Sequence, residues 1–196
     1  MHEISEMVST LPEHPFWTGI DQEQIAKIAP WSIRVEFLPE QYLCHARHAA
    51  QHVYLTLSGR VGLGFDHPSE GFRMIQTVDA PAVVGISWLS QPYKSCYDAK
   101  ALTEGEAVTI DAVRLREALE TDHALARQLY PQFVSVLIGR LQASSLQLFE
   151  LFECCNSLRC PNRYSEKGEA GFSRECCHRN GTETRHEHGR EKREHP

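Results

Sequence analysis

The sequence predicts a mainly β fold: a double-stranded β-helix, or jelly roll, with flanking helices and a long C-terminal helix. About eight short apolar runs separated by Pro, Gly and Ser turn signals lie in residues 31–111. Apolar residues at helical spacing follow in residues 130–152. These patterns divide the chain into an N-terminal helical segment (1–30), a β-roll domain (31–111), C-terminal helices (112–153) and a tail (154–196).

Residues 14–30 predict a short lead-in and one helix. Asp21 can cap the N-terminus of that helix, and Gln24 follows three residues later, as in a capping box. The aromatic residues Phe16 and Trp17 come just before it, and we expect them to plug the core of the domain.

Within the roll, residues 32–37 alternate between apolar and polar side chains and predict a half-buried strand. The strongest strand signal is in residues 53–65, where two β-branched and aromatic runs meet at Ser58 and Gly59. Glycine adopts positive φ without steric cost, so we expect the two runs to form an antiparallel hairpin.

Residues 53–61 (VYLTLSGRV) resemble the central motif of the cyclic-nucleotide-binding domain family, which includes catabolite activator proteins and regulatory subunits of kinases and channels. The resemblance covers roughly residues 14–152 and implies a regulatory sensor module on a jelly roll. Transcription factors of this family carry a helix-turn-helix after the roll, and this sequence shows no such pattern. The segment from Gly85 to Tyr93 (GISWLSQPY) resembles the cassette of small bacterial members of the family that lack a DNA-binding domain.

Family members hold the ligand in a phosphate-binding cassette, with a Gly-Glu pair and, about ten residues later, an Arg. In this sequence Gly85 matches the glycine, Ile86 stands at the Glu position, and Ser95 stands at the Arg position with Lys94 beside it. The ligand-binding residues implied by the resemblance are Gly85, Ile86, Ser87, Lys94, Ser95 and Cys96.

The implied ligand is cyclic AMP or cyclic GMP, bound weakly because both specific contacts of the cassette are altered. Lys94 can offer the phosphate a point charge in place of a bidentate fork, and Ser87 can reach a ribose hydroxyl. A different small ligand and a ligand-free dimerising adaptor remain open alternatives.

A cupin-type metal-dependent enzyme on the same roll is a further alternative, because Cys44, His45, His48 and His52 lie close together in the sequence. A cupin uses H-x-H followed by a Glu a few residues later. This chain has H-x-x-H at His45 and His48, and the next Glu after them is Glu70. We therefore expect solvated loop histidines and no metal site. No catalytic triad or nucleotide-binding loop is present, so we do not expect an enzyme.

Two helices are expected after the roll, capped by Asp111 and Asp122, with Pro131 marking a kink or a fresh start. A heptad-like seam follows, consisting of Tyr130, Val134, Leu137, Leu141, Ser144, Leu148 and Leu151. This seam predicts a helix that packs on its own roll, that forms a homodimer through residues 130–152, or that does both.

The charge of the chain is unevenly distributed. Residues 1–153 carry 11 Lys and Arg against 19 Asp and Glu, and this negative excess argues against nucleic-acid binding. Residues 154–196 hold five of the seven cysteines and few large apolar residues, so we expect a disordered tail able to bind metal only adventitiously. The sequence has no apolar run of membrane-spanning length and no signal-peptide pattern at its start, and we expect a cytoplasmic protein with no membrane partner.

Overall fold

The computed structural model of the chain describes residues 11–157, and these lie in the unit Met1–Glu153 apart from the last residues of the final helix. Within residues 11–31, four short helical elements precede the roll: η1 (Leu11–Glu13), η2 (Pro15–Trp17), α2 (Gln22–Ile28) and η3 (Ala29–Trp31). Two helices follow it: α3 (Ala112–Thr121) and α4 (His123–Ser157).

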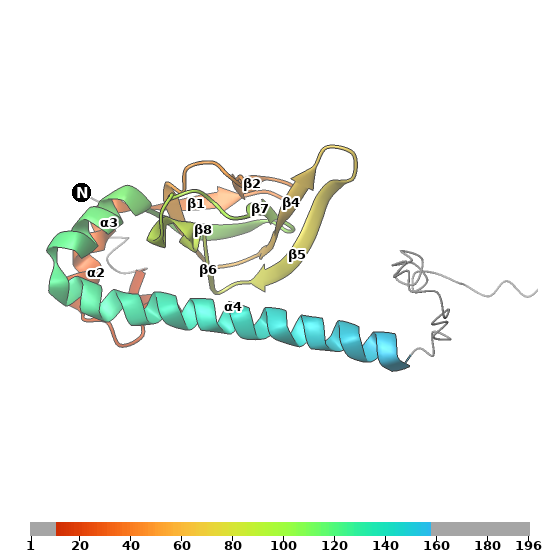
Figure 1. The fold of residues 1–196 in the computed structure, drawn as a ribbon. Coiled ribbons are helices and arrows are strands. Elements are labelled where there is room, and N and C mark those ends of the chain that lie inside the picture. The colour runs from red at the N-terminus through yellow and green to blue at the C-terminus, as the bar shows by residue number, and fades with distance from the viewer. Residues whose placement is uncertain (1–10, 158–196) are drawn as a thin grey trace, which may run out of the picture. The chain divides into compact units, whose positions relative to one another are not determined.

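The roll consists of two four-stranded antiparallel sheets (Figure 1). One sheet has the order β1 (Ser32–Phe37), β8 (Gly105–Asp111), β3 (His52–Thr56) and β6 (Ala82–Val84). The other has the order β2 (Tyr42–Cys44), β7 (Asp98–Ala101), β4 (Arg60–His67) and β5 (Gly71–Asp79). The predicted jelly roll with flanking helices is confirmed.

The predicted hairpin at residues 53–65 is wrong, because β3 and β4 belong to different sheets. β3 pairs with β6 and β8, whereas β4 pairs with β5 and β7. The glycine turn between them carries the chain from one sheet to the other. Gly59 has φ 83°, and a Cβ on it would lie 2.6 Å from the Glu104 carbonyl oxygen, so the crossing requires glycine here.

Both expected caps of the C-terminal helices are present. The Asp111 carboxylate accepts hydrogen bonds from the backbone N–H groups of Val113 and Arg114, at 2.9 and 3.0 Å. Asp122 does the same at the start of α4. The helix α4 continues through Pro131 without a fresh start.

The predicted capping box of α2 is wrong. Asp21 occupies the N-cap position, but its side chain makes no capping hydrogen bond. Its carboxylate instead accepts from Gln128 of α4 at 2.6 Å. The side chain of Gln24 accepts from Lys27 at 3.0 Å. A tertiary contact with α4 has therefore replaced the local cap.

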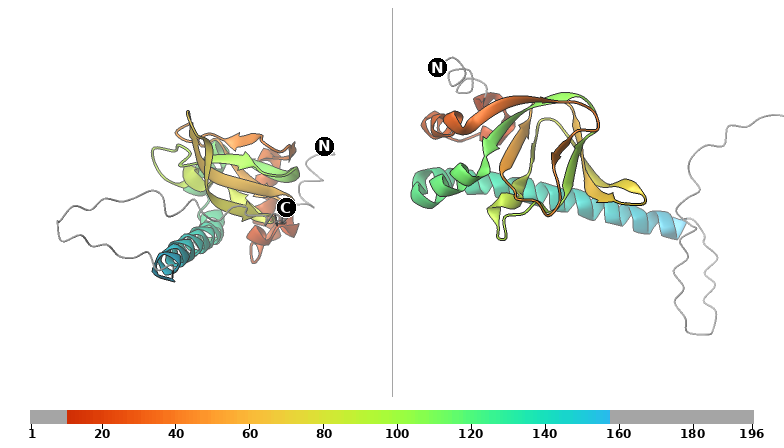
Figure 2. Two further views of the ribbon diagram at one scale, coloured as in Figure 1. Left: turned by 90° about the vertical axis from the view of Figure 1, so that its right-hand side faces the viewer. Right: turned by 90° about the horizontal axis from the view of Figure 1, so that it is seen from above.

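The helix α4 runs along one side of the roll, as all three ribbon views show (Figures 1 and 2). Its first half is anchored by Leu125, Leu129 and Phe133, which are almost fully buried. The Phe133 ring lies 4.8 Å from Phe16 and 5.2 Å from Trp88, measured between ring centroids. The expected aromatic plug at Phe16 and Trp17 is thus part of the core that holds α4.

The helix α4 also carries many exposed apolar side chains. Its exposed large apolar residues are Tyr130, Val134, Leu137, Ile138, Leu141, Leu146, Leu148, Phe149 and Phe152. The helix thus packs on its own roll and still presents most of the predicted seam to solvent.

No helix among residues 11–157 has the length and apolarity needed to cross a membrane. The expected disordered tail lies outside the described residues, apart from the end of α4, which continues to Ser157.

Phe133→Ala should lower the free energy of unfolding by about 3–5 kcal/mol, because it empties a buried site where three segments meet. The matched change Phe149→Ala on the same helix, at a side chain that is 58% exposed, should cost much less. Urea unfolding at low protein concentration measures both, and equal losses would show that Phe133 is not an anchor.

Candidate functional site

The cassette begins where β6 ends and the chain turns sharply into the short helix η4 (Ile86–Leu89). Gly85 makes this turn with φ 81°, and a Cβ there would lie 2.7 Å from the His52 carbonyl oxygen. Positive φ and close backbone approach both require glycine at this position. The glycine predicted from the family pattern thus has a structural reason in this chain.

The loop after η4 is held at several points. The Ser87 hydroxyl accepts a hydrogen bond from the Cys96 backbone N–H at 3.1 Å. The Ser95 backbone N–H donates to the His48 carbonyl, and the Ser95 carbonyl accepts from Arg47, both at 2.8 Å. The first bond joins the two ends of the cassette, and the other two tie its second end to the segment that holds Arg47 and His48.

A cavity of about 430 Å³ lies between the cassette and α4, within the range of roughly 300–1,000 Å³ that small-molecule sites occupy. Its lining residues are Cys44, Leu63, Ile75, Gln76, Val84, Gly85, Ile86, Ser87, Leu89, Ser90, Ser95, Cys96, Tyr97, Ala99, Leu137, Arg140, Leu141 and Ser144. Five of the six predicted ligand-binding residues are in this set. The sixth, Lys94, is exposed and is not among the lining residues, so its role stays a prediction.

The wall formed by α4 was missed by the sequence analysis. Leu137, Arg140, Leu141 and Ser144 belong to a helix that begins far downstream of the cassette. One signal was available, because Arg140 is the only charged residue in residues 128–149. An isolated charge within a long apolar helix indicates a special environment.

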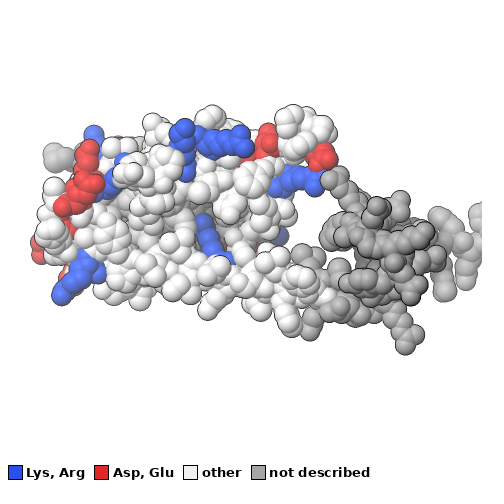
Figure 3. Space-filling view, in the orientation of Figure 1, with Lys and Arg blue, Asp and Glu red and all other residues white. Residues whose placement is uncertain are grey.

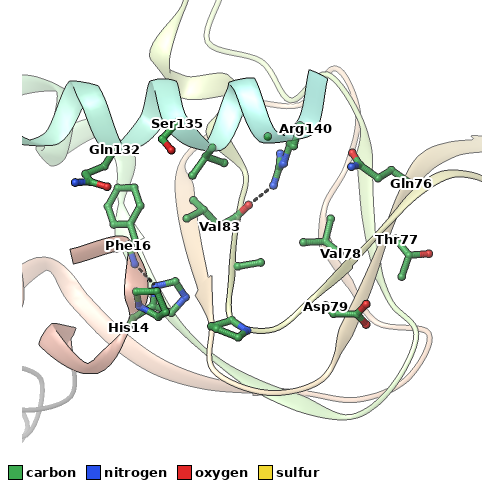
Figure 4. A pocket seen from close by; sticks show the side chains of 15 residues that line it. His14, Phe16, Gln76, Thr77, Val78, Asp79, Val83, Gln132, Ser135 and Arg140 are labelled. Carbon is green, nitrogen blue, oxygen red and sulfur yellow. Dashed lines mark hydrogen bonds between the residues drawn. The ribbon is translucent and has the colours of Figure 1, made fainter. Parts of the chain in front are cut away.

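The Arg140 guanidinium is half-buried and points from α4 toward the roll, where it donates to the Val83 carbonyl oxygen (Figure 4). Burial lowers the pKa of Arg140, but a guanidinium stays charged at neutral pH. No ion pair joins Arg140 to a carboxylate within residues 11–157. In the space-filling view a basic side chain is visible in the hollow between the roll and α4, surrounded by uncharged atoms (Figure 3).

The floor of the cavity adds no negative charge at neutral pH. Burial raises the pKa of the Cys44 thiol, although a hydrogen bond with Ser95 acts in the opposite direction. Beneath the cassette, burial raises the pKa of Tyr54 to about 12, and the Tyr54 hydroxyl donates to the Leu43 carbonyl at 2.7 Å. Both groups are therefore protonated near pH 7.

A second cavity of about 440 Å³ lies beside the first and shares Arg140 and Gln76 with it. His14, Phe16 and Gln132 line its other end (Figure 4). Arg140 is thus reached from both cavities.

The histidines that suggested a metal site are engaged otherwise. The His45 ring stacks on Tyr42 at 4.6 Å, and its Nδ1 lies 3.5 Å from a carboxylate oxygen of Asp98. That carboxylate also accepts from the backbone of Ala46 and Asp66, at 2.9 and 2.8 Å. Among the residues that the structure describes, no group of three or more His, Cys, Asp or Glu side chains is placed to hold a metal ion. The tail cysteines and histidines from residue 158 on lie outside them.

Gly85→Ala should destabilise the protein by at least about 1–2 kcal/mol, the cost of a left-handed conformation for a residue with a Cβ. Gly139→Ala is the matched control, because that glycine lies inside α4 with open space around it, and it should stabilise by about 0.5–1 kcal/mol. Thermal unfolding of the two variants gives the answer. A neutral Gly85→Ala would mean that the turn into η4 is not constrained as described.

The comparisons with known proteins agree with this fold. The family model for the cyclic nucleotide-binding domain matches residues 34–122. The chain is similar to a structure described as a cyclic nucleotide-binding protein from Geobacter metallireducens GS-15, with 26% identity and a TM-score of 0.62 over 68% of this chain and 96% of that one. No match was found among curated proteins.

Two more distant structures share the fold. A cyclic nucleotide-binding domain from Methylobacillus flagellatus KT has 15% identity and a TM-score of 0.60, over 75% of this chain and 83% of that one. The regulatory domain of Toxoplasma gondii PKA, crystallised with cAMP, has 13% identity and a TM-score of 0.54, over 68% of this chain and 50% of that one. Residues 34–122 of this chain therefore form a domain of the cyclic nucleotide-binding family.

Proposed function

We propose that the chain is a regulatory sensor module in which a small ligand binds between the cassette and α4 and changes what α4 presents to a partner. One observation carries this proposal: five predicted cassette residues and four residues of α4 line the same cavity. A ligand in that cavity contacts the site and the output helix at once.

A direct path for the signal supports the proposal. Trp88 belongs to η4 and packs edge-on against Phe133 of α4, with an interplanar angle of 82°. Because both rings are almost fully buried, a displacement of η4 has to be accommodated by α4. A ligand that binds better to one arrangement of η4 therefore shifts the equilibrium of α4.

For the ligand we propose a cyclic nucleotide bound weakly by a degenerate cassette. The family match and the structure of the T. gondii domain with cAMP support this ligand class. The cassette itself offers no carboxylate for the ribose and no guanidinium for the phosphate, since Ile86 and Ser95 occupy those positions. We propose no DNA-binding role for this chain.

For the output we propose homodimerisation through residues 130–152. Between residues 128 and 149 the only charge is Arg140, which points toward the roll, so the outer face there is uncharged and largely apolar. Exposed apolar patches of this kind mark interaction sites. A ligand-free dimerising adaptor is the second candidate, because an exposed apolar face can form a dimer without any ligand.

Titration calorimetry with cyclic AMP and with cyclic GMP tests the ligand. We expect dissociation constants in the micromolar range or weaker, because a lost charged contact costs about 1.5–3 kcal/mol, or roughly 10–150-fold in affinity. The double variant Ile86→Glu with Ser95→Arg should bind more tightly, while Lys94→Ala reports whether Lys94 contributes. Nanomolar binding by the wild type would contradict the degenerate cassette, and no binding by either protein would favour the adaptor.

Sedimentation at micromolar concentration tests the dimer. Leu148 is a seam residue that is 57% exposed and does not line the cavity, so Leu148→Glu should shift the protein toward monomer by several kcal/mol of dimer stability, because it buries an unpaired charge. Gln147→Glu adds the same charge to the same helix away from the seam and should leave the dimer intact. A wild-type protein that is monomeric at all concentrations would contradict the homodimer.

A further inference from the structure

We propose that Arg140 of α4 is the anion-binding residue of the cavity, and that the ligand carries a single negative charge, as a cyclic nucleotide does. The proposal deepens the proposed function and rests on it, because it assigns the ligand to the same cavity. It places the charge recognition on the output helix and not in the cassette.

The first argument concerns the burial of Arg140 and its hydrogen-bond partner. Its guanidinium is half-buried, and its one protein acceptor among the recorded hydrogen bonds of residues 11–157 is the neutral Val83 carbonyl. Burying a charge is costly unless an opposite charge compensates it. A carbonyl oxygen compensates only part of that cost, whereas an anionic oxygen accepts a shorter and stronger bond from a guanidinium. An incoming anion is therefore a better partner than the one Arg140 has.

The composition of the cavity wall is the second argument. Among the residues that line the cavity, Arg140 is the only Lys, Arg, His, Asp or Glu. Most of the remaining wall is apolar, with Leu63, Val84 and Leu137 among the contributors. One negative charge on the ligand would be paired at Arg140, whereas a second would be buried without a partner. The cavity therefore favours monoanions over dianions and cations.

Arg140 connects ligand binding to the proposed output helix, because it belongs to α4. A ligand that pairs with Arg140 binds the same guanidinium that donates to the Val83 carbonyl, which belongs to β6 immediately before the cassette. It therefore binds at a point where α4 is tied to the roll. Charge on the ligand is then the property that the helix detects.

A pair of fluorescent probes tests this without knowledge of the natural ligand. Anilinonaphthalene sulfonate is a monoanion with an apolar body, and N-phenylnaphthylamine has the same ring system without the sulfonate. Arg140→Met should weaken binding of the sulfonate about 10-fold or more, the effect of losing a charged hydrogen bond. It should leave the neutral probe within about two-fold. Arg140→Lys, which keeps the charge, should recover part of the sulfonate binding.

Arg127→Met is the matched control, because Arg127 is an exposed arginine on the same helix and outside the cavity. Competition between the two probes on the wild type establishes that they occupy one site. Equal sulfonate affinity in the wild type and Arg140→Met, with competition intact, would overturn the role of Arg140 and leave the ligand cavity standing. If the two probes did not compete, or if neither probe bound, the inference and the proposed cavity would be overturned together.

Discussion

The packing of Phe133 is the contact on which the arrangement of this domain depends. A single ring on α4 touches Phe16 from the N-terminal segment and Trp88 from the cassette. Three segments that are far apart in the sequence thus share one buried cluster. Because protein interiors are close-packed, none of the three can move without the others adjusting. The cavity exists because α4 leaves this anchor and continues past the cassette with Leu137, Arg140 and Leu141 along its edge.

The cavity is mostly apolar with one cation, and the cation comes from the helix. No Asp or Glu is among the described residues that line this cavity, so Arg140 meets no carboxylate there. The cassette supplies shape through Gly85 and Ser87, and α4 supplies charge. On the proposal that Arg140 binds the ligand, the helix supplies the charge in a chain that has Ile86 and Ser95 where the family pattern has Glu and Arg.

Local patterns in the sequence were sufficient for the fold class, the strands and the helix caps at Asp111 and Asp122. They failed where the decisive contact is distant. The alternating runs at residues 53–65 identify two strands but not their partners, and these turned out to lie in different sheets. The side chain of Asp21 bonds Gln128, about a hundred residues away, and not its own helix. The cassette residues followed a family pattern, whereas Arg140 belonged to none, and only its isolation in an apolar helix distinguished it.

Hydrogen exchange with and without saturating cyclic AMP tests most directly whether the cassette and α4 respond as one unit. Amide exchange reports local opening residue by residue, so it reads both walls of the cavity in one experiment. The account predicts slower exchange in residues 86–96 and also in residues 133–144 when the ligand is bound. Slower exchange in the cassette alone, or an unchanged rate in both segments, would contradict the claim that a ligand in this cavity acts on α4.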